Sequence, residues 1–326
     1  MVRVIVLILL VVGLALTGCG PRIQDYGVAS VAPHLAPDAL VAPDGARLPM
    51  RVWPAAGRTE AVVIALHGFN DYAQAFDGPG PWWAEHGLTI YAYDQRGFGS
   101  APEPGIWAGV DGLTKDLHAA IVAVRQRHPG VPIYLLGSSM GASVAMAAIR
   151  RDDRADVAGL VLVAPAVWGR ITMNGFYRFM LWFGVQVMPA NKATGRALRI
   201  RPSDNIEMLR GLGRDPLIIK RTRIDAIYGL VNLMDAALAA APEIRVPMLV
   251  LYGGRDELIP KGPVELMMSR LTGPYRVVVY RDGWHMLLRD LQAKTVWRDI
   301  AGWIKDPSAP LPSDEERRRL PLFAEN

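Results

Sequence analysis

Residues 131–150 (VPIYLLGSSMGASVAMAAIR) constrain the fold more than any other stretch of the chain. A short apolar run meets the turn GSSMG at 137–141, and an alanine-rich segment of high helix propensity follows. This order predicts a buried strand, a sharp turn and a helix. Ser139 stands at the centre of the turn, with glycine two residues before and two residues after it. A Cβ at either glycine would collide with the strand or the helix, so the pattern predicts a strained turn that exposes the Ser139 hydroxyl.

Similar apolar runs predict the other strands of a sheet. They cover residues 61–66, 88–94, 157–165, 246–254 and 275–283. Apolar residues at helical spacing predict helices between and after these runs. The predicted helices cover residues 111–128, about 262–271 and about 286–305. Residues 39–53, with the Asp44-Gly45 pair, predict a β-hairpin at the start of the domain. Strands that alternate with helices indicate an α/β fold with a mostly parallel sheet and helices on both faces.

The composition is that of a globular protein with a sizeable core. Hydrophobic residues make up 51% of the chain and charged residues 21%, which excludes a disordered chain. The formal net charge of +5 is too small to indicate a nucleic-acid partner. The sequence has no phosphate-binding glycine loop, zinc-ligand spacing or dinucleotide fingerprint, so we expect no metal and no cofactor. A single cysteine, Cys19, excludes an intramolecular disulfide.

The N-terminus predicts export and lipid attachment. A basic start, an apolar run at 4–16 and small residues that end at Cys19 form a signal-peptide pattern. The segment LTGC resembles a bacterial lipobox, which implies removal of residues 1–18 and lipidation of Cys19. An uncleaved signal anchor is the alternative. Gly20 after the cysteine resembles the outer-membrane sorting pattern of Gram-negative lipoproteins, so we expect a lipid-anchored protein of the bacterial cell envelope, on the periplasmic side of the outer membrane.

Changes in composition divide the rest of the chain. A tether rich in Pro, Ala and Gly is expected at 19–38, and a charged, loosely ordered tail at 306–326. The α/β core is expected at 39–165 and 243–305. Residues 166–242 break the alternation of strands and helices, so we expect them to form a helical cap inserted after the sixth strand.

The cap has two parts of different composition. Residues 171–190 are dense in Phe, Trp, Tyr, Met and Leu. They predict either an amphipathic helix with its aromatic side chains in the core, or an apolar acyl-binding tunnel and membrane-facing lid. Residues 192–223 are rich in Lys and Arg and carry few acids, which predicts either a solvated helical face or a contact with anionic headgroups.

A serine nucleophile needs a base, an acid that orients the base, and donors for the oxyanion. The GSSMG turn resembles the nucleophile elbow of α/β-hydrolases, in which the acid and then the histidine follow the serine along the chain. His285 lies directly after the last predicted strand and is the only histidine beyond His128, so it is the expected base. Asp256 follows the preceding strand and is the expected acid. Glu257 stays open as the acid, and Asp282 is a weaker competitor because it is too close in sequence to the histidine.

Two backbone N–H groups are expected to form the oxyanion hole. One belongs to Met140, which follows the serine at the N-terminus of the predicted helix, where the helix dipole favours negative charge. The other belongs to Phe69, in the His67-Gly68-Phe69 segment that ends a buried strand.

The chain resembles the α/β-hydrolase superfamily and, within it, the monoacylglycerol lipase and lysophospholipase branch, also called serine aminopeptidase-like. The motifs that carry the resemblance are ALHGFN (65–70), YDQRGFGSAP (93–102), LLGSSMGAS (135–143), GGRDELIP (253–260) and DGWHMLL (282–288). The resemblance covers roughly residues 39–305 and implies hydrolysis of lipid carboxylic esters through an acyl-enzyme, without metal or cofactor. Ser138 and Ala142 stand where this branch commonly has His and Gly, so the exact substrate does not carry over.

The resulting hypothesis is an anchored serine hydrolase that cleaves monoacylglycerol or lysophospholipid esters through Ser139. The same triad would serve a short-chain esterase, a peptidase or an acyltransferase, so these activities stay open. A non-catalytic anchored binding protein is a further alternative, although binding alone needs no Ser, Asp and His at these places.

Overall fold

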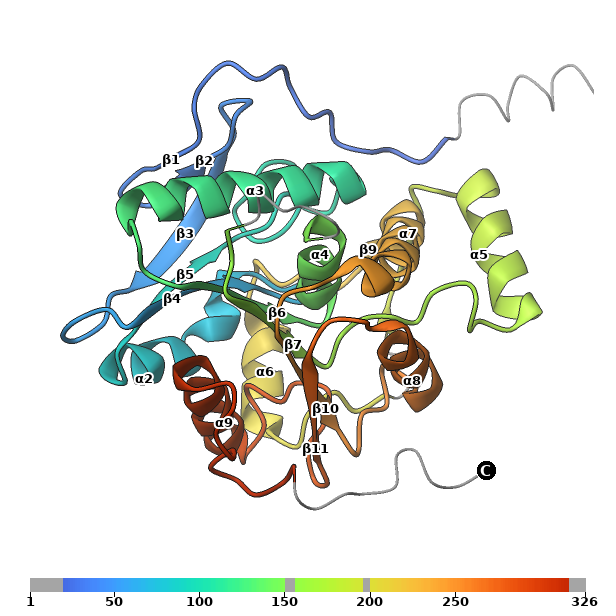
Figure 1. Cartoon of the computed structure of the whole chain (residues 1–326). Coiled ribbons are helices and arrows are strands. Elements are labelled where there is room, and N and C mark those ends of the chain that lie inside the picture. Colours follow the sequence, from blue (N-terminus) through green and yellow to red (C-terminus); the bar gives the residue numbers. More distant parts are fainter. Residues whose placement is uncertain (1–19, 150–155, 196–199, 317–326) are drawn as a thin grey trace, which may run out of the picture.

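The computed structural model describes residues 20–149, 156–195 and 200–316 (Figure 1). The predicted signal peptide at 1–18 and the predicted lipidation site at Cys19 lie outside the described residues. Among the described residues, nine strands form one sheet in the order β1-β2-β3-β5-β4-β6-β7-β10-β11. The strands are β1 (His34–Leu35), β2 (Ala39–Val41), β3 (Arg47–Trp53), β4 (Ala61–Leu66), β5 (Leu88–Tyr93), β6 (Ile133–Ser138), β7 (Gly159–Val163), β10 (Met248–Gly253) and β11 (Tyr275–Tyr280).

The sheet is parallel from β5 through β11 and antiparallel from β1 to β5. Every residue of β4, β5, β7 and β10 is buried, as expected for strands covered on both faces. The predicted hairpin is confirmed as β2 and β3, which turn at Gly45 with a positive φ of 81°. The predicted α/β architecture is therefore confirmed.

Helices cover both faces of the sheet (Figure 1). One face packs against α3 (Gly109–Arg127), α4 (Met140–Ala148) and α8 (Lys261–Arg270), and the other against the 3-10 helix η1 (Ala73–Phe76), α2 (Pro79–Glu85) and α9 (Ala293–Lys305). The helix predicted from about residue 286 begins later, at Ala293. Residues 285–292 form turns instead, and these turns place His285.

The insertion after β7 forms the cap. It contains α5 (Gly175–Val187), α6 (Ile206–Arg214), α7 (Ile224–Ala240), the short helix η3 (Ala241–Glu243) and a two-stranded ribbon of β8 (Lys192–Ala193) and β9 (Thr222–Arg223). The cap follows the seventh strand rather than the sixth because the two-residue strand β1 was not predicted. Residues 224–243 are long and apolar enough to cross a membrane by length and composition, but α7 packs against α4 with Leu233, Ala237 and Leu238 buried.

The aromatic part of the cap is not a core element. On α5, Gly184 and Val185 are buried, whereas large apolar side chains such as Phe176 (67% exposed) and Trp182 (54% exposed) face outward. The prediction that the aromatic side chains of this helix pack in the core is therefore wrong. In the basic part, helix α6 is shorter than the predicted helical face, although its Arg210 and Arg214 are exposed as expected.

The two terminal segments pack on the domain instead of running free. Residues 20–38 were expected to be a tether, yet Gln24 is 6% exposed and Ile23 forms a β-bridge with Trp107. The described part of the tail, 306–316, is also held, because Leu311 is buried. Composition alone predicted that both segments would be loose, because it carries no information about contacts between residues that are distant in the sequence.

Candidate active site

The Ser139 turn has the strained geometry that the sequence predicts. Ser139 lies between β6 and α4 with φ 52° and ψ −113°, a backbone conformation that L-residues rarely adopt. A Cβ at Gly137 would lie 2.3 Å from the Ala142 backbone nitrogen, and a Cβ at Gly141 would lie 2.2 Å from the Leu66 carbonyl oxygen. Both glycines are therefore required for the close approach of strand and helix.

The structure brings Ser139, His285 and Asp256 together. His285 Nε2 lies 2.9 Å from Ser139 Oγ, and His285 Nδ1 lies 2.8 Å from Asp256 Oδ2. The side chains of His285 and Asp256 are 6% and 0% exposed. Asp256 Oδ1 accepts hydrogen bonds from the backbone N–H groups of Leu258 (2.8 Å) and Ile259 (3.0 Å), which hold the carboxylate facing the imidazole.

The two competing carboxylates make other contacts. Glu257 Oε2 accepts a hydrogen bond from the Arg201 backbone N–H at 2.7 Å, so it faces the cap rather than the imidazole. Asp282 forms an exposed ion pair with Arg255. The geometry therefore selects Asp256 as the partner of the histidine.

The predicted oxyanion segment lies against the serine. A Cβ at Gly68 would lie 3.4 Å from Ser139 Cβ, which is van der Waals contact with the nucleophile. His67 Nδ1 donates to the Gly68 carbonyl at 2.8 Å. Because N–H and C=O point in opposite directions across a trans peptide, this bond turns the Phe69 N–H away from His67. Within the described part of the chain, the N–H groups of Phe69 and Met140 donate to no other protein group.

A buried polar network holds this segment, and it was not predicted. His67 is fully buried, and burial lowers its pKa below the usual value, so the ring is neutral with one donor and one acceptor. The acceptor, Nε2, receives the Gln95 backbone N–H at 2.9 Å. The Gln95 side chain donates to the His67 carbonyl, also at 2.9 Å. The glycine-rich motif at 94–100 therefore braces the oxyanion segment, a role for which its sequence gave no signal.

A mostly apolar cavity of about 640 Å³ reaches Ser139 and His285. Cap residues form much of its wall. They include Trp168, Met173, Ile200, Ile227, Leu230 and Met234.

The cavity wall also contains polar groups. Arg289, four residues after His285, forms an ion pair with Asp71. The Arg289 Nη1 atom is buried and has no hydrogen-bond partner in the described structure. Sequence reasoning missed this pair because its members lie on segments that are distant along the chain. Among the described residues, no group of three His, Cys, Asp or Glu side chains is placed to hold a metal ion.

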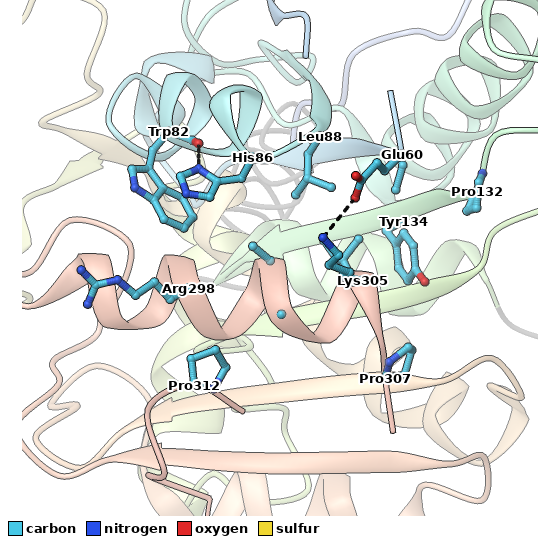
Figure 2. Close-up of a pocket in the computed structure, with 14 residues that line it drawn as sticks. Glu60, Trp82, His86, Leu88, Pro132, Tyr134, Arg298, Lys305, Pro307 and Pro312 are labelled. Atoms are coloured by element: carbon cyan, nitrogen blue, oxygen red, sulfur yellow. Dashed lines mark hydrogen bonds and ion pairs between the residues drawn. The ribbon is translucent and has the colours of Figure 1, made fainter. Parts of the chain in front are cut away.

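A second hollow of about 580 Å³ lies between α2 and α9, near the amino ends of the parallel strands (Figure 2). Glu60 and Lys305 approach to 3.8 Å across it, and the rings of Trp82 and His86 stack at 3.7 Å. Its lining contains no serine, threonine or cysteine, so among the described residues it has no counterpart of Ser139. The catalytic chemistry therefore belongs to the Ser139 cavity, at the carboxyl ends of the strands.

A mostly parallel sheet with a strained serine after β6, bonded through histidine to aspartate, defines an α/β-hydrolase. More closely, the chain belongs to the Hydrolase_4 family (serine aminopeptidase, S33), whose model matches residues 57–292. It is 26% identical over 277 residues to the monoglyceride lipase of Homo sapiens, with 83% of this chain and 90% of that protein covered.

Two further comparisons agree. The monoacylglycerol lipase of Mycolicibacterium smegmatis is 23% identical over 273 residues, covering 80% of this chain and 93% of that protein. The crystal structure of a soluble monoglyceride lipase variant from Saccharomyces cerevisiae superposes with a TM-score of 0.69 at 16% identity, covering 88% of this chain and 99% of that one. The chain is therefore a hydrolase of the lipase and esterase type.

Proposed function

We propose that the protein hydrolyses carboxylic esters of lipids, monoacylglycerols first, through an acyl-enzyme on Ser139. The observation that carries this proposal is the hydrogen-bonded triad at one end of an apolar cavity of about 640 Å³. A cavity of this size and character suits an acyl chain. The monoglyceride lipases to which the chain is similar support the same substrate class.

The proposed mechanism assigns one task to each group. Ser139 Oγ attacks the ester carbonyl while His285 Nε2 takes its proton, and the oxyanion accepts hydrogen bonds from the Phe69 and Met140 N–H groups. Asp256 fixes the imidazole tautomer and stabilises the imidazolium. His285 then returns the proton to the leaving alcohol, and a water molecule, activated by the same histidine, releases the fatty acid.

The Asp71–Arg289 pair favours a substrate ester whose alcohol part is neutral over one whose alcohol part carries a phosphate. The pair places the Arg289 guanidinium beside the Asp71 carboxylate in the cavity wall. A glycerol hydroxyl donates as well as accepts, so it fits this arrangement. A phosphate only accepts, and Arg289, already paired with Asp71, offers it no net positive charge. This preference orders the two predicted substrates, with monoacylglycerol ahead of lysophospholipid.

Short-chain esters, peptides and acyl transfer to another acceptor use the same triad and are separated by substrate choice. The deciding assay compares glycerol monoesters from short to long acyl chains with a lysophospholipid of matched chain and a peptide anilide. The proposal expects the highest kcat/KM for medium or long monoacylglycerols, with free fatty acid as product. The proposal would be wrong if kcat/KM were highest for the shortest esters or for the peptide. It would also be wrong if the main reaction were ester formation with an added alcohol.

Ser139→Ala tests the nucleophile and the non-catalytic alternative together. We expect kcat to fall by about 10³-fold or more, because the triad acts as a unit. A fluorophosphonate probe should label the wild-type protein and not the variant. Failure to label the wild-type serine would favour an anchored binding protein.

Membrane attachment is the second part of the proposal. We infer that Cys19 carries lipid and holds the protein on the periplasmic side of the outer membrane, and that the exposed apolar face of α5 contacts the bilayer. Support for the bilayer contact comes from the exposure of Phe176, Phe179 and Trp182, each more than half exposed on α5. Metabolic labelling with a fatty acid analogue should mark the wild-type chain and not Cys19→Ser.

A further inference from the structure

The segment directly after the proposed lipidation site is bound to the domain near the oxyanion loop. We call residues 22–26 the arm. Gln24 in the arm is 6% exposed, and its Nε2 lies within hydrogen-bond distance of the carbonyl oxygens of Pro102 (3.1 Å), Glu103 (3.3 Å) and Ile106 (2.8 Å). Its backbone N–H donates to the Trp107 carbonyl at 2.8 Å. One buried amide side chain therefore ties the arm to the loop at 97–107.

Trp107, at the end of this loop, packs against the oxyanion segment. Its ring meets the ring of Phe69 edge to face, with centroids 6.2 Å apart, and lies 6.5 Å from the ring of Phe98. On its other side it reaches α7, where a Cβ at Gly229 would lie 2.4 Å from Trp107 Cδ1. Trp107 is therefore held between the residue that supplies an oxyanion donor and the cap.

A second set of contacts supports the peptide group between Gly68 and Phe69. The ring of Phe98 meets the His67 ring edge to face at 5.6 Å, and His67 donates to the Gly68 carbonyl. The arm also touches the cap directly, because the Arg22 backbone N–H donates to Asp225 Oδ2 at 3.1 Å. Displacement of the loop at 97–107 would therefore loosen both the side chain and the backbone support of Phe69.

We propose that Gln24 is a positioning residue: through the loop at 97–107 and Trp107 it sets the Phe69 N–H for the oxyanion. This inference rests on the proposed function, in which that N–H stabilises the transition state. The arm lies outside residues 57–292, which the family model matches. This positioning role makes the membrane-proximal segment part of the catalytic support rather than a passive linker.

The test replaces Gln24 with methionine, which keeps the side-chain length and removes the amide donor. Complete loss of an oxyanion donor costs about 10² to 10³ in kcat, so a displaced donor should cost about tenfold, with KM within about twofold of wild type. Affinity for a boronic acid transition-state analogue should fall by the same factor as kcat/KM. Val28→Ala, in the same segment and 90% exposed, is the matched control and should leave these constants unchanged.

Active sites are counted by fluorophosphonate titration, so that misfolded protein does not lower the apparent kcat. Trp107→Phe supplies the second variant. If the arm acts through Trp107, the cost of Gln24→Met in the Trp107→Phe background should be smaller than in wild type. Wild-type kcat per titrated site in Gln24→Met, with only a lower Tm, would overturn the inference, and so would equal costs in both backgrounds. A wild-type protein that the probe does not label at Ser139 would instead overturn the proposed function.

Discussion

Two adjacent acidic residues have different environments in this site. Asp256 is fully buried against His285, whereas Glu257 bonds to the Arg201 backbone N–H. We predict that Asp256→Asn lowers kcat by about 10⁴-fold, because the wrong imidazole tautomer would be favoured. Glu257→Gln should stay within about threefold of wild type. Steady-state kinetics on one soluble ester checks both, and a larger loss in Glu257→Gln would reverse the assignment.

His67 links acid pH to the stability of the oxyanion segment. Its lowered pKa means that, below about pH 6.5, the unfolded chain binds a proton that the folded protein excludes. The free energy of unfolding should therefore rise with pH up to about 6.5 and level off above it, with a slope of up to about 1.4 kcal/mol per pH unit from this group. Urea titrations of wild type and His67→Asn between pH 5 and 7.5 isolate this contribution. Parallel pH profiles in the two proteins would contradict the prediction.

At the residue scale, sequence motifs were enough to predict which three side chains come together at the site. Ser139, Asp256 and His285 each follow a buried strand, and parallel strands bring their carboxyl ends to one edge of the sheet. The bracing contacts could not be predicted in this way. Asp71 and Arg289 are 218 positions apart, and no local pattern marks either residue.

At the scale of elements, α5 shows what periodicity leaves open. Its dense apolar sequence fits a buried helix and a membrane-facing helix equally well, and only the packed structure shows which face is covered. The same holds for the segment at 20–38. Its Pro, Ala and Gly content predicts a linker, yet the bonds of Gln24 to the loop at 97–107 order it.

The exposed face of α5 gives an element-scale prediction. Phe179→Ser with Trp182→Ser removes two side chains that are 55% and 54% exposed, so the fold should lose little stability. Burial of each ring in a bilayer is worth about 1.5–3 kcal/mol, so the double variant should bind phospholipid vesicles at least tenfold more weakly. Turnover of a soluble ester should not change. Co-sedimentation of the chain without residues 1–19 measures the partition, and equal binding would show that α5 does not meet the bilayer.

At the scale of the whole molecule, the arm, which follows the proposed anchor in the sequence, lies close to the end of α5. Arg22 N–H bonds to Asp225 at the start of α7, and the Asp225 N–H bonds to the Pro189 carbonyl just after α5, at 3.0 Å. Figure 1 shows the N-terminal segment leading toward α7 and α5. Met173 and Ala193, on either side of α5 in sequence, line the cavity. The arm, the apolar helix and the cavity wall therefore lie on one side of the molecule.

This arrangement predicts that anchor and helix act together on substrate in a membrane. Once the proposed lipid at Cys19 is in the membrane, the apolar face of α5 is held at a high effective concentration near the same bilayer. Loss of both attachments should therefore weaken membrane binding more than loss of either one. In the full-length chain, Cys19→Ser should reduce hydrolysis of monoacylglycerol embedded in vesicles by tenfold or more. The same variant should hydrolyse a soluble ester at the wild-type rate, since the triad is unaltered.

Adding Phe179→Ser and Trp182→Ser to Cys19→Ser should lower vesicle hydrolysis further. The same two α5 changes in the lipidated protein should lower it less, because the anchor still holds the protein at the membrane. Equal vesicle hydrolysis by wild type and Cys19→Ser, at matched enzyme concentration, would show that the enzyme draws its substrate from solution rather than from the bilayer.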